Sequence, residues 1–181
     1  CCFTSPTLRL PTLRSRDRTL CTKTVKGGRT MTPERLWEAF CDHNLDLDPY
    51  NLTYTAWQFL DGKKGCDRLA SLVRAGIKTA TSSLVKIFEL DGTELPKEGD
   101  YSVIMDSEED ALFIIKNKSV VVNKFCDVGE DIAYKEGEGD QTLEYWRKAH
   151  EKYFREQCEE YGIEFSEDME VITEEFELIF Q

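Results

Sequence analysis

The chain has 181 residues and a formal net charge of -12, with 23 Lys and Arg against 35 Asp and Glu. An acidic body lacks the basic surface through which long nucleic acids bind, so the composition argues against a long duplex partner and favours a small or short ligand. No apolar run approaches the roughly 20 residues of a bilayer span, so we expect no membrane partner.

The cysteines and histidines predict neither a disulfide framework nor a metal centre. The seven cysteines are scattered without a C-x-x-C pair, which is typical of reduced thiols inside the cell. Only His43 and His150 could supply imidazole ligands to a metal ion. We therefore expect a cytoplasmic protein with no metal and no cofactor.

Residues 1–30 differ in composition from the rest of the chain. They carry seven basic side chains against one acid, and Pro6 and Pro11 interrupt any regular apolar face. We predict a disordered basic tail, which is either a targeting segment or sequence derived from cloning or upstream translation. The remaining residues, 31–181, are predicted to form one domain.

Two helices are predicted in the first part of this domain. Thr32 can cap a helix that begins with proline and continues with apolar residues at helical spacing. A second helix is predicted near residues 67–75, where the apolar stripe ends at Gly76, a natural C-cap.

The segment that follows, residues 76–83, is the first candidate functional site. Its sequence Gly-Ile-Lys-Thr-Ala-Thr-Ser-Ser places one cation, Lys78, among four hydroxyl groups. An amine in a partly dry pocket loses its proton more readily, so Lys78 could act as a base or activate a hydroxyl. Thr81 would lie on the same side in a turn, whereas a strand would separate the two. The alternative is a surface lysine beside a β-prone strand.

Strands are predicted over residues 101–106, 111–116, 119–122 and 170–180. The hydrophobic period there shortens towards two or gives way to continuous apolar runs. The strands do not alternate regularly with helices, which favours an α+β fold. We predict a small barrel of antiparallel or mixed strands with flanking helices.

An acidic loop, residues 136–140, is the second candidate segment. Its sequence Glu-Gly-Glu-Gly-Asp has glycines that let the backbone turn, so that a carboxylate such as Glu136 reaches a cleft and serves as proton partner to an amine. Arg147 could bind a carboxylate of this loop or a substrate phosphate. The alternative is an ordinary acidic loop before a helix cap.

A long helix is predicted after Asp140 and before Gly162. Asp140 is a good N-cap. One face of the helix would be apolar or aromatic, formed by Leu143, Trp146, His150, Tyr153, Phe154, Cys158 and Tyr161. We interpret the aromatic side chains as core residues and His150 as a packed, hydrogen-bonded histidine.

Taken together, these segments resemble the ASCH family, a branch of the PUA-like β-barrels. The matching segments are Trp57-Gln58-Phe59, residues 72–81, 95–100 and 133–140, Tyr145-Trp146-Arg147 and His150. They span most of residues 50–181. The family pattern G-x-K-x-x-T-x-R is met by Gly76, Lys78 and Thr81, with Ser83 in place of its arginine.

The resemblance implies a PUA-like barrel and a site for a nucleoside or an RNA-derived ligand. Some small bacterial members are described as amidases that remove acyl groups from N4 of cytidine, with a lysine, a threonine and a glutamate as catalytic residues. These carry over to Lys78, Thr81 and Glu136. Lys78 would deprotonate the Thr81 hydroxyl, which attacks the amide carbonyl, and Glu136 would protonate the leaving amine.

The remaining residues of the expected site would bind the ligand: Gly76, Ser83, Glu138 and Arg147. The expected partner is a modified nucleoside or a short single-stranded RNA. Other family members are described as RNA-binding modules, with ribonuclease activity attributed to some of them, so an RNA-binding module with or without that activity is the alternative. A regulatory module that binds a ligand without turnover is a third reading.

Overall fold

The computed structural model describes residues 31–45, 52–59 and 63–181, and the predicted tail lies outside this part of the chain. The elements follow in the order α1 (Pro33–His43), β1 (Tyr54–Trp57), α2 (Lys63–Arg74), β2 (Ala80–Leu84), α3 (Val85–Asp91), β3 (Tyr101–Met105), β4 (Ala111–Lys124), the 3₁₀ helix η1 (Phe125–Asp127), α4 (Glu130–Glu136), α5 (Leu143–Glu160) and β5 (Glu170–Phe180). No helix among the described residues is long and apolar enough to cross a membrane.

The strands form one five-stranded sheet in the order β1-β3-β4-β5-β2. β1 and β3 run parallel, whereas β3 pairs with β4 and β2 with β5 in the antiparallel sense. The mixed α+β prediction is therefore confirmed. The predicted barrel is wrong: β1 and β2 are the outer strands of the order, and the sheet is not closed. A barrel closes only when its outer strands pair, and these two strands have only four and five residues.

The chain divides into two compact units, the first composed of residues 1–70, 100–116 and 178–181. In its described part, α1 packs its buried side against β1 and β3. Thr32 caps α1 as predicted, because its hydroxyl accepts a hydrogen bond from the Arg35 amide at 3.4 Å. The core of this unit consists of Leu36, Trp37, Phe40, Tyr54, Ala56, Tyr101, Val103, Met105, Ala111 and Ile114.

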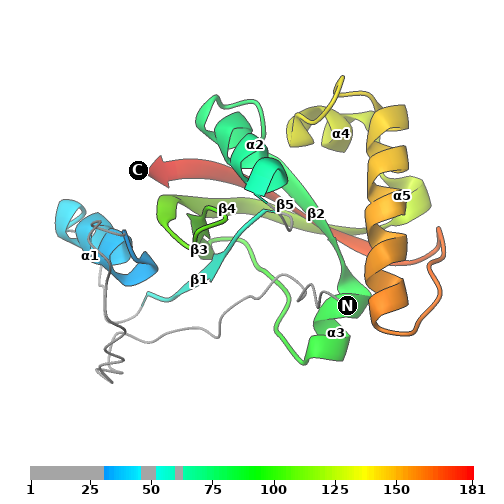
Figure 1. The fold of residues 1–181 in the computed structure, drawn as a ribbon, viewed down its shortest axis with the longest axis horizontal. Helices are drawn as coiled ribbons and strands as arrows, with labels where there is room; N and C mark the ends of the chain where they lie inside the picture. The colour runs from blue at the N-terminus through cyan, green and yellow to red at the C-terminus, as the bar shows by residue number, and fades with distance from the viewer. Residues whose placement is uncertain (1–30, 46–51, 60–62) are drawn as a thin grey trace. The chain divides into compact units, whose positions relative to one another are not determined.

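The second unit consists of residues 71–99 and 117–177 and holds the two candidate segments. Its long helix α5 buries Trp146, Phe154 and Cys158, which confirms the predicted apolar face. These side chains share a core with Leu84 of β2 and Val171 of β5. The short helix α4 packs against both α5 and β2, and Figure 1 shows it beside the N-terminal half of α5.

Several element boundaries differ from the predictions. The predicted strands 111–116 and 119–122 are one long strand, β4. The cap of α5 is Thr142, two residues after the predicted Asp140, and its hydroxyl accepts a hydrogen bond from the Tyr145 amide at 3.1 Å. Asp140 instead accepts hydrogen bonds from the amide and the hydroxyl of Thr142. Glu136 was predicted in a loop but ends α4, a short helix that the sequence pattern did not indicate.

Candidate functional site

The end of α2 fixes the backbone at Lys78. Gly76 adopts the left-handed conformation, with φ of 68°, so it caps α2 as predicted. The amides of Ile77 and Lys78 then both donate to the carbonyl of Leu72, at 2.9 and 3.1 Å. One residue later the Thr79 amide donates to the carbonyl of Lys135 in α4 at 2.7 Å. Lys78 is therefore held between a helix cap and a contact with α4.

The end of α4 directs two carboxylates towards Lys78. Glu136 is the last residue of α4, and Gly137 follows as a left-handed C-cap with φ of 68°. A Cβ atom at Gly137 would lie 2.5 Å from the carbonyl oxygen of Ile77, so no side chain fits where the two segments meet. This glycine turn allows both Glu136 and Glu138 to face the same amine.

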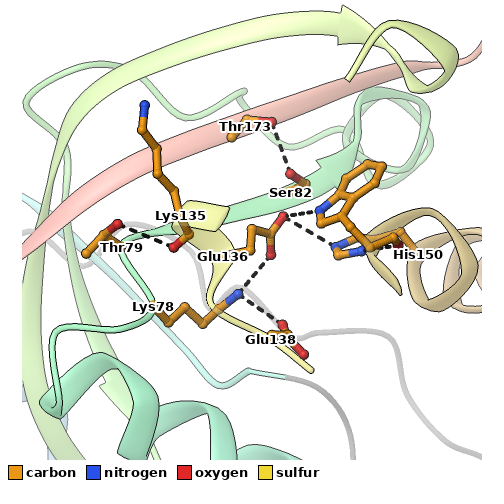
Figure 2. Close-up of polar contacts among 9 residues, drawn as sticks. Lys78, Thr79, Ser82, Lys135, Glu136, Glu138, His150 and Thr173 are labelled. Carbon is orange, nitrogen blue, oxygen red and sulfur yellow. Dashed lines mark hydrogen bonds and ion pairs between the residues drawn. The ribbon is translucent and has the colours of Figure 1, made fainter. Parts of the chain in front are cut away.

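The Lys78 amine donates to both carboxylates. Its Nζ atom lies 2.8 Å from Oε2 of Glu136 and 3.1 Å from Oε1 of Glu138, and Figure 2 shows the amine between them. The side chains of Lys78 and Glu136 are each only 1% exposed, whereas that of Glu138 is 17% exposed. The cluster thus has a closed side at Glu136 and a side open to solvent at Glu138.

The second oxygen of Glu136 is occupied by α5. Trp146 donates its indole Nε1 to Oε1 of Glu136 at 2.8 Å, and Nε2 of His150 lies 3.4 Å from the same oxygen. The His150 ring stacks on Trp146 with centroids 4.2 Å apart, and its Nδ1 lies 3.0 Å from the Trp146 carbonyl. Both ring nitrogens of His150 therefore face acceptors, and Glu136 accepts hydrogen bonds at both of its oxygens.

The charges in this cluster stabilise one another. Burial alone would lower the pKa of Lys78, but the nearby Glu136 and Glu138 carboxylates outweigh it and raise that pKa above its ordinary value. Burial alone would raise the pKa of Glu136, but the charge of Lys78 and the contacts from His150 lower it well below its usual range. In the resting structure Lys78 is an ammonium ion and Glu136 a carboxylate.

The other residues predicted in the segment 76–83 lie along β2. Thr81 is half-buried and pairs with Glu174 of β5, and Ser83 pairs with Ile172. Side chains alternate along a strand, so Thr81 and Ser83 point to the face opposite that of Ser82. The contacts described above bring Lys78, Glu136 and Glu138 together but do not include the Thr81 hydroxyl.

Arg147 lies in a separate set of contacts. Its guanidinium donates to the carbonyls of Phe125, Cys126 and Val128, at 3.3, 2.8 and 3.1 Å. It also lies over the Phe125 ring, 5.9 Å from the centroid. These contacts tie α5 to η1 and the turn after it, so the described contacts of Arg147 stabilise the fold beside the cluster.

The sequence did not reveal that Trp146 belongs to the cluster. Trp146 is a core residue, as its helical spacing predicts, and its indole nitrogen also donates a hydrogen bond to a buried carboxylate. A tryptophan on a buried stripe usually needs a partner for that nitrogen, and this signal could have linked it to an acidic residue nearby. The described residues contain no group of three His, Cys, Asp or Glu side chains placed to hold a metal ion.

The fold and the cluster together define an α+β protein with a buried lysine held between two carboxylates at the end of a short helix. The ASCH domain family model matches residues 55–180, so the chain belongs to the ASCH domain family. The resemblance inferred from the sequence is thereby confirmed. A search of curated proteins gives no match.

Two solved structures are similar over most of the chain. One is the ASCH domain from Lactobacillus crispatus JV V101, which is 30% identical, with 83% of this chain and 97% of that chain covered and a TM-score of 0.72. The other is a protein from Enterococcus faecalis V583, which is 34% identical, with 81% and 87% covered and a TM-score of 0.75.

Proposed function

We propose that this ASCH domain protein is an amidohydrolase that removes the acyl group from an N4-acylated cytidine, with Lys78 at the centre of its site. The observation that carries the proposal is the buried Lys78 amine between Glu136 and Glu138. A buried ion pair stabilises a fold little compared with apolar packing, so its presence favours a chemical role.

Family membership supports the choice of ligand. Membership in the ASCH domain family suggests a role related to nucleic acids. The acidic composition favours a nucleoside over a long nucleic acid as the ligand. A nucleoside needs few polar contacts, and the partly exposed Glu138 provides a carboxylate that could accept a hydrogen bond from the amide N–H of the substrate.

The proposed reaction has two stages. The oxygen of a nucleophile forms a bond to the acyl carbon, and its proton passes to the neutral amine of Lys78. When the bond from the acyl carbon to N4 breaks, this proton is delivered to the leaving amine of cytosine. Both oxygens of Glu136 already accept hydrogen bonds, which favours a role in holding Lys78 over the role of proton donor that the resemblance implies.

The resemblance assigns the nucleophile to Thr81, with hydrolysis of an acyl-threonine by water as the final step. Thr81 lies three residues beyond Lys78 but within β2, paired with Glu174. A water molecule that attacks the acyl carbon directly is the other nucleophile compatible with the same proton transfers. Removal of the Thr81 hydroxyl separates the two mechanisms.

The test is incubation of the full chain with N4-acetylcytidine, followed by chromatographic measurement of cytidine and acetate. We expect turnover by the wild type, loss of turnover in Lys78→Met and normal turnover in Lys135→Met, which breaks the ion pair between α4 and Glu175 of β5, outside the cluster. Thr81→Val should be inactive if the hydroxyl is the nucleophile and active if water attacks. Circular dichroism of each variant checks that it is folded.

The alternative function is an RNA-binding module, with or without ribonuclease activity. The same variants are therefore incubated with a short single-stranded RNA at low and high salt. Salt-sensitive binding or cleavage of the RNA, together with intact N4-acetylcytidine, would replace the amidohydrolase proposal by this alternative.

A further inference from the structure

The two carboxylates at Lys78 differ in their access to solvent. Glu136 is as deeply buried as the lysine, and both of its oxygens accept hydrogen bonds from other side chains. Glu138 lies on the turn after α4, 3.1 Å from the amine, and is partly exposed. One carboxylate is therefore fixed in the protein interior, and the other is accessible to solvent.

The proposed reaction requires a step that neither α4 nor α5 can supply. Lys78 is an ammonium ion in the resting structure, and an ammonium ion cannot accept the proton of a nucleophile. A group in contact with Nζ must first take a proton from it. Glu136 is held as a carboxylate by Lys78, Trp146 and His150, so it is poorly suited to that step.

This inference rests on the proposed function and assigns a further residue to it. We propose that Glu138 is the proton acceptor that converts Lys78 from ammonium to amine when a substrate covers the site. An N–H bond of Lys78 breaks and an O–H bond forms on Glu138 across their hydrogen bond. The proton moves within the pair, so the total charge of the site does not change.

Exclusion of water provides the driving force. An ion pair that loses its hydration is destabilised unless other hydrogen bonds hold its charges, and moving the proton from the cation to the carboxylate then removes both charges. Trp146 and His150 hold the charge of Glu136 in this way. In the resting structure Glu138 is partly exposed, so solvent reaches this side of the pair. A bound nucleoside would remove that water, and neutral Lys78 would form only when the substrate is in place. Glu136 and His150 also face the pair. When Lys78 gives up its proton, the hydrogen bond from Trp146 and the contact with His150 continue to hold the charge of Glu136.

The test compares rate–pH profiles for deacylation of N4-acetylcytidine by the wild type, Glu138→Gln and Glu138→Asp. Loss of the acceptor should reduce kcat of Glu138→Gln at pH 7 by at least about 100-fold. The rate of this variant should then rise about tenfold per pH unit, because hydroxide replaces the missing acceptor. Glu138→Asp should recover part of the activity. Glu175→Gln, which breaks the Lys135 ion pair, should retain the wild-type profile.

A purely electrostatic role for Glu138 makes the opposite prediction. Removal of its negative charge would favour the neutral amine of Lys78, so Glu138→Gln would be as active as the wild type at pH 7 or faster. That result would overturn the assignment and leave the amidohydrolase proposal intact. If the wild type does not deacylate the compound, the proposed function is lost and the acceptor role with it.

NMR of lysine-labelled protein provides a readout independent of turnover. The nitrogen signal of the Lys78 side chain should titrate at a lower pH in Glu138→Gln than in the wild type, because one of the two carboxylates facing it is gone. An unchanged titration would show that Glu138 is not coupled to Lys78 and would overturn the inference by itself.

Discussion

Two ion pairs formed by neighbouring residues of α4 differ in their surroundings. Lys135 pairs with Glu175 at 2.6 Å, and these side chains are 35% and 31% exposed. Glu136, the next residue along the helix, pairs with Lys78 at 2.8 Å, and both side chains are 1% exposed. The distances are similar, but only the second pair has lost its water.

This difference in burial separates a structural contact from a candidate site. Solvent screens the Lys135–Glu175 pair, and such pairs contribute between nothing and about 1 kcal/mol to stability. The Lys78–Glu136 pair has exchanged its hydration for hydrogen bonds, so either charge alone would be strongly unfavourable. Its groups are also close enough to exchange protons away from bulk water, which the exposed pair cannot do.

The largest expected effect comes from breaking the buried pair. Lys78→Ala leaves the Glu136 carboxylate buried without its cation and should reduce the free energy of unfolding by about 3–5 kcal/mol. Lys135→Ala removes the exposed pair and should cost less than about 1 kcal/mol. Urea unfolding at pH 7 measures both.

A double variant provides the control for this comparison. Lys78→Met combined with Glu136→Gln removes both charges and keeps the shapes of the side chains, so it should be more stable than Lys78→Ala. Equal losses in Lys78→Ala and Lys135→Ala would show that burial does not distinguish the two pairs.

A smaller effect is expected from the glycine that aligns the two carboxylates. Gly137→Ala forces a side chain into a left-handed conformation and against the Ile77 carbonyl, and should cost about 2–4 kcal/mol. Gly92 has a similar φ of 66°, but a Cβ atom there meets nothing within 4 Å. Gly92→Ala should therefore show only the backbone penalty of about 1–2 kcal/mol. Thermal unfolding that gives the same loss for both would show that the Ile77 contact relaxes freely.

The features that could be predicted from the sequence are those set by local patterns. The apolar stripe of α5, the Thr32 cap and the Gly76 cap each depend on residues within a few positions of one another. The contact between Lys78 and Glu136 joins residues 58 positions apart and depends on how α4 docks against β2. No spacing rule predicts such a contact, and only the family resemblance indicated it.

At Thr81 the local sequence pattern was compatible with two backbone conformations. The sequence allowed a turn that would place it beside Lys78 or a strand that would separate them. The segment from Ala80 forms strand β2, in which buried and half-buried positions alternate and each residue pairs with β5. Strand β4 is a second case in which the apolar pattern was incomplete. It continues through the polar residues 117–118, because the hydrogen bonds between strands are made by the backbone and do not require apolar side chains.

The smallest expected effect is the pH dependence that the buried pair gives to stability. The pKa of Glu136 is lowered from its ordinary value of 4.5 by Lys78 and His150, which outweigh the opposite effect of burial. A carboxyl group with a lowered pKa stabilises the folded state fully above its unfolded pKa and loses that contribution as the pH falls towards the folded pKa. Between pH 4.5 and 3.5, Glu136 should therefore account for a loss of about 1 kcal/mol.

Urea unfolding of the wild type, Glu136→Gln and Glu175→Gln over this pH range isolates the contribution. Glu136→Gln should lose stability less steeply than the wild type as the pH falls, because the group responsible is absent. Glu175→Gln leaves Glu136 and Lys78 in place, so its slope should equal that of the wild type. Equal slopes in all three proteins would mean that Glu136 binds protons alike in the folded and unfolded states. The Lys78–Glu136 pair would then contribute no more to the pH dependence of stability than the Lys135–Glu175 pair does.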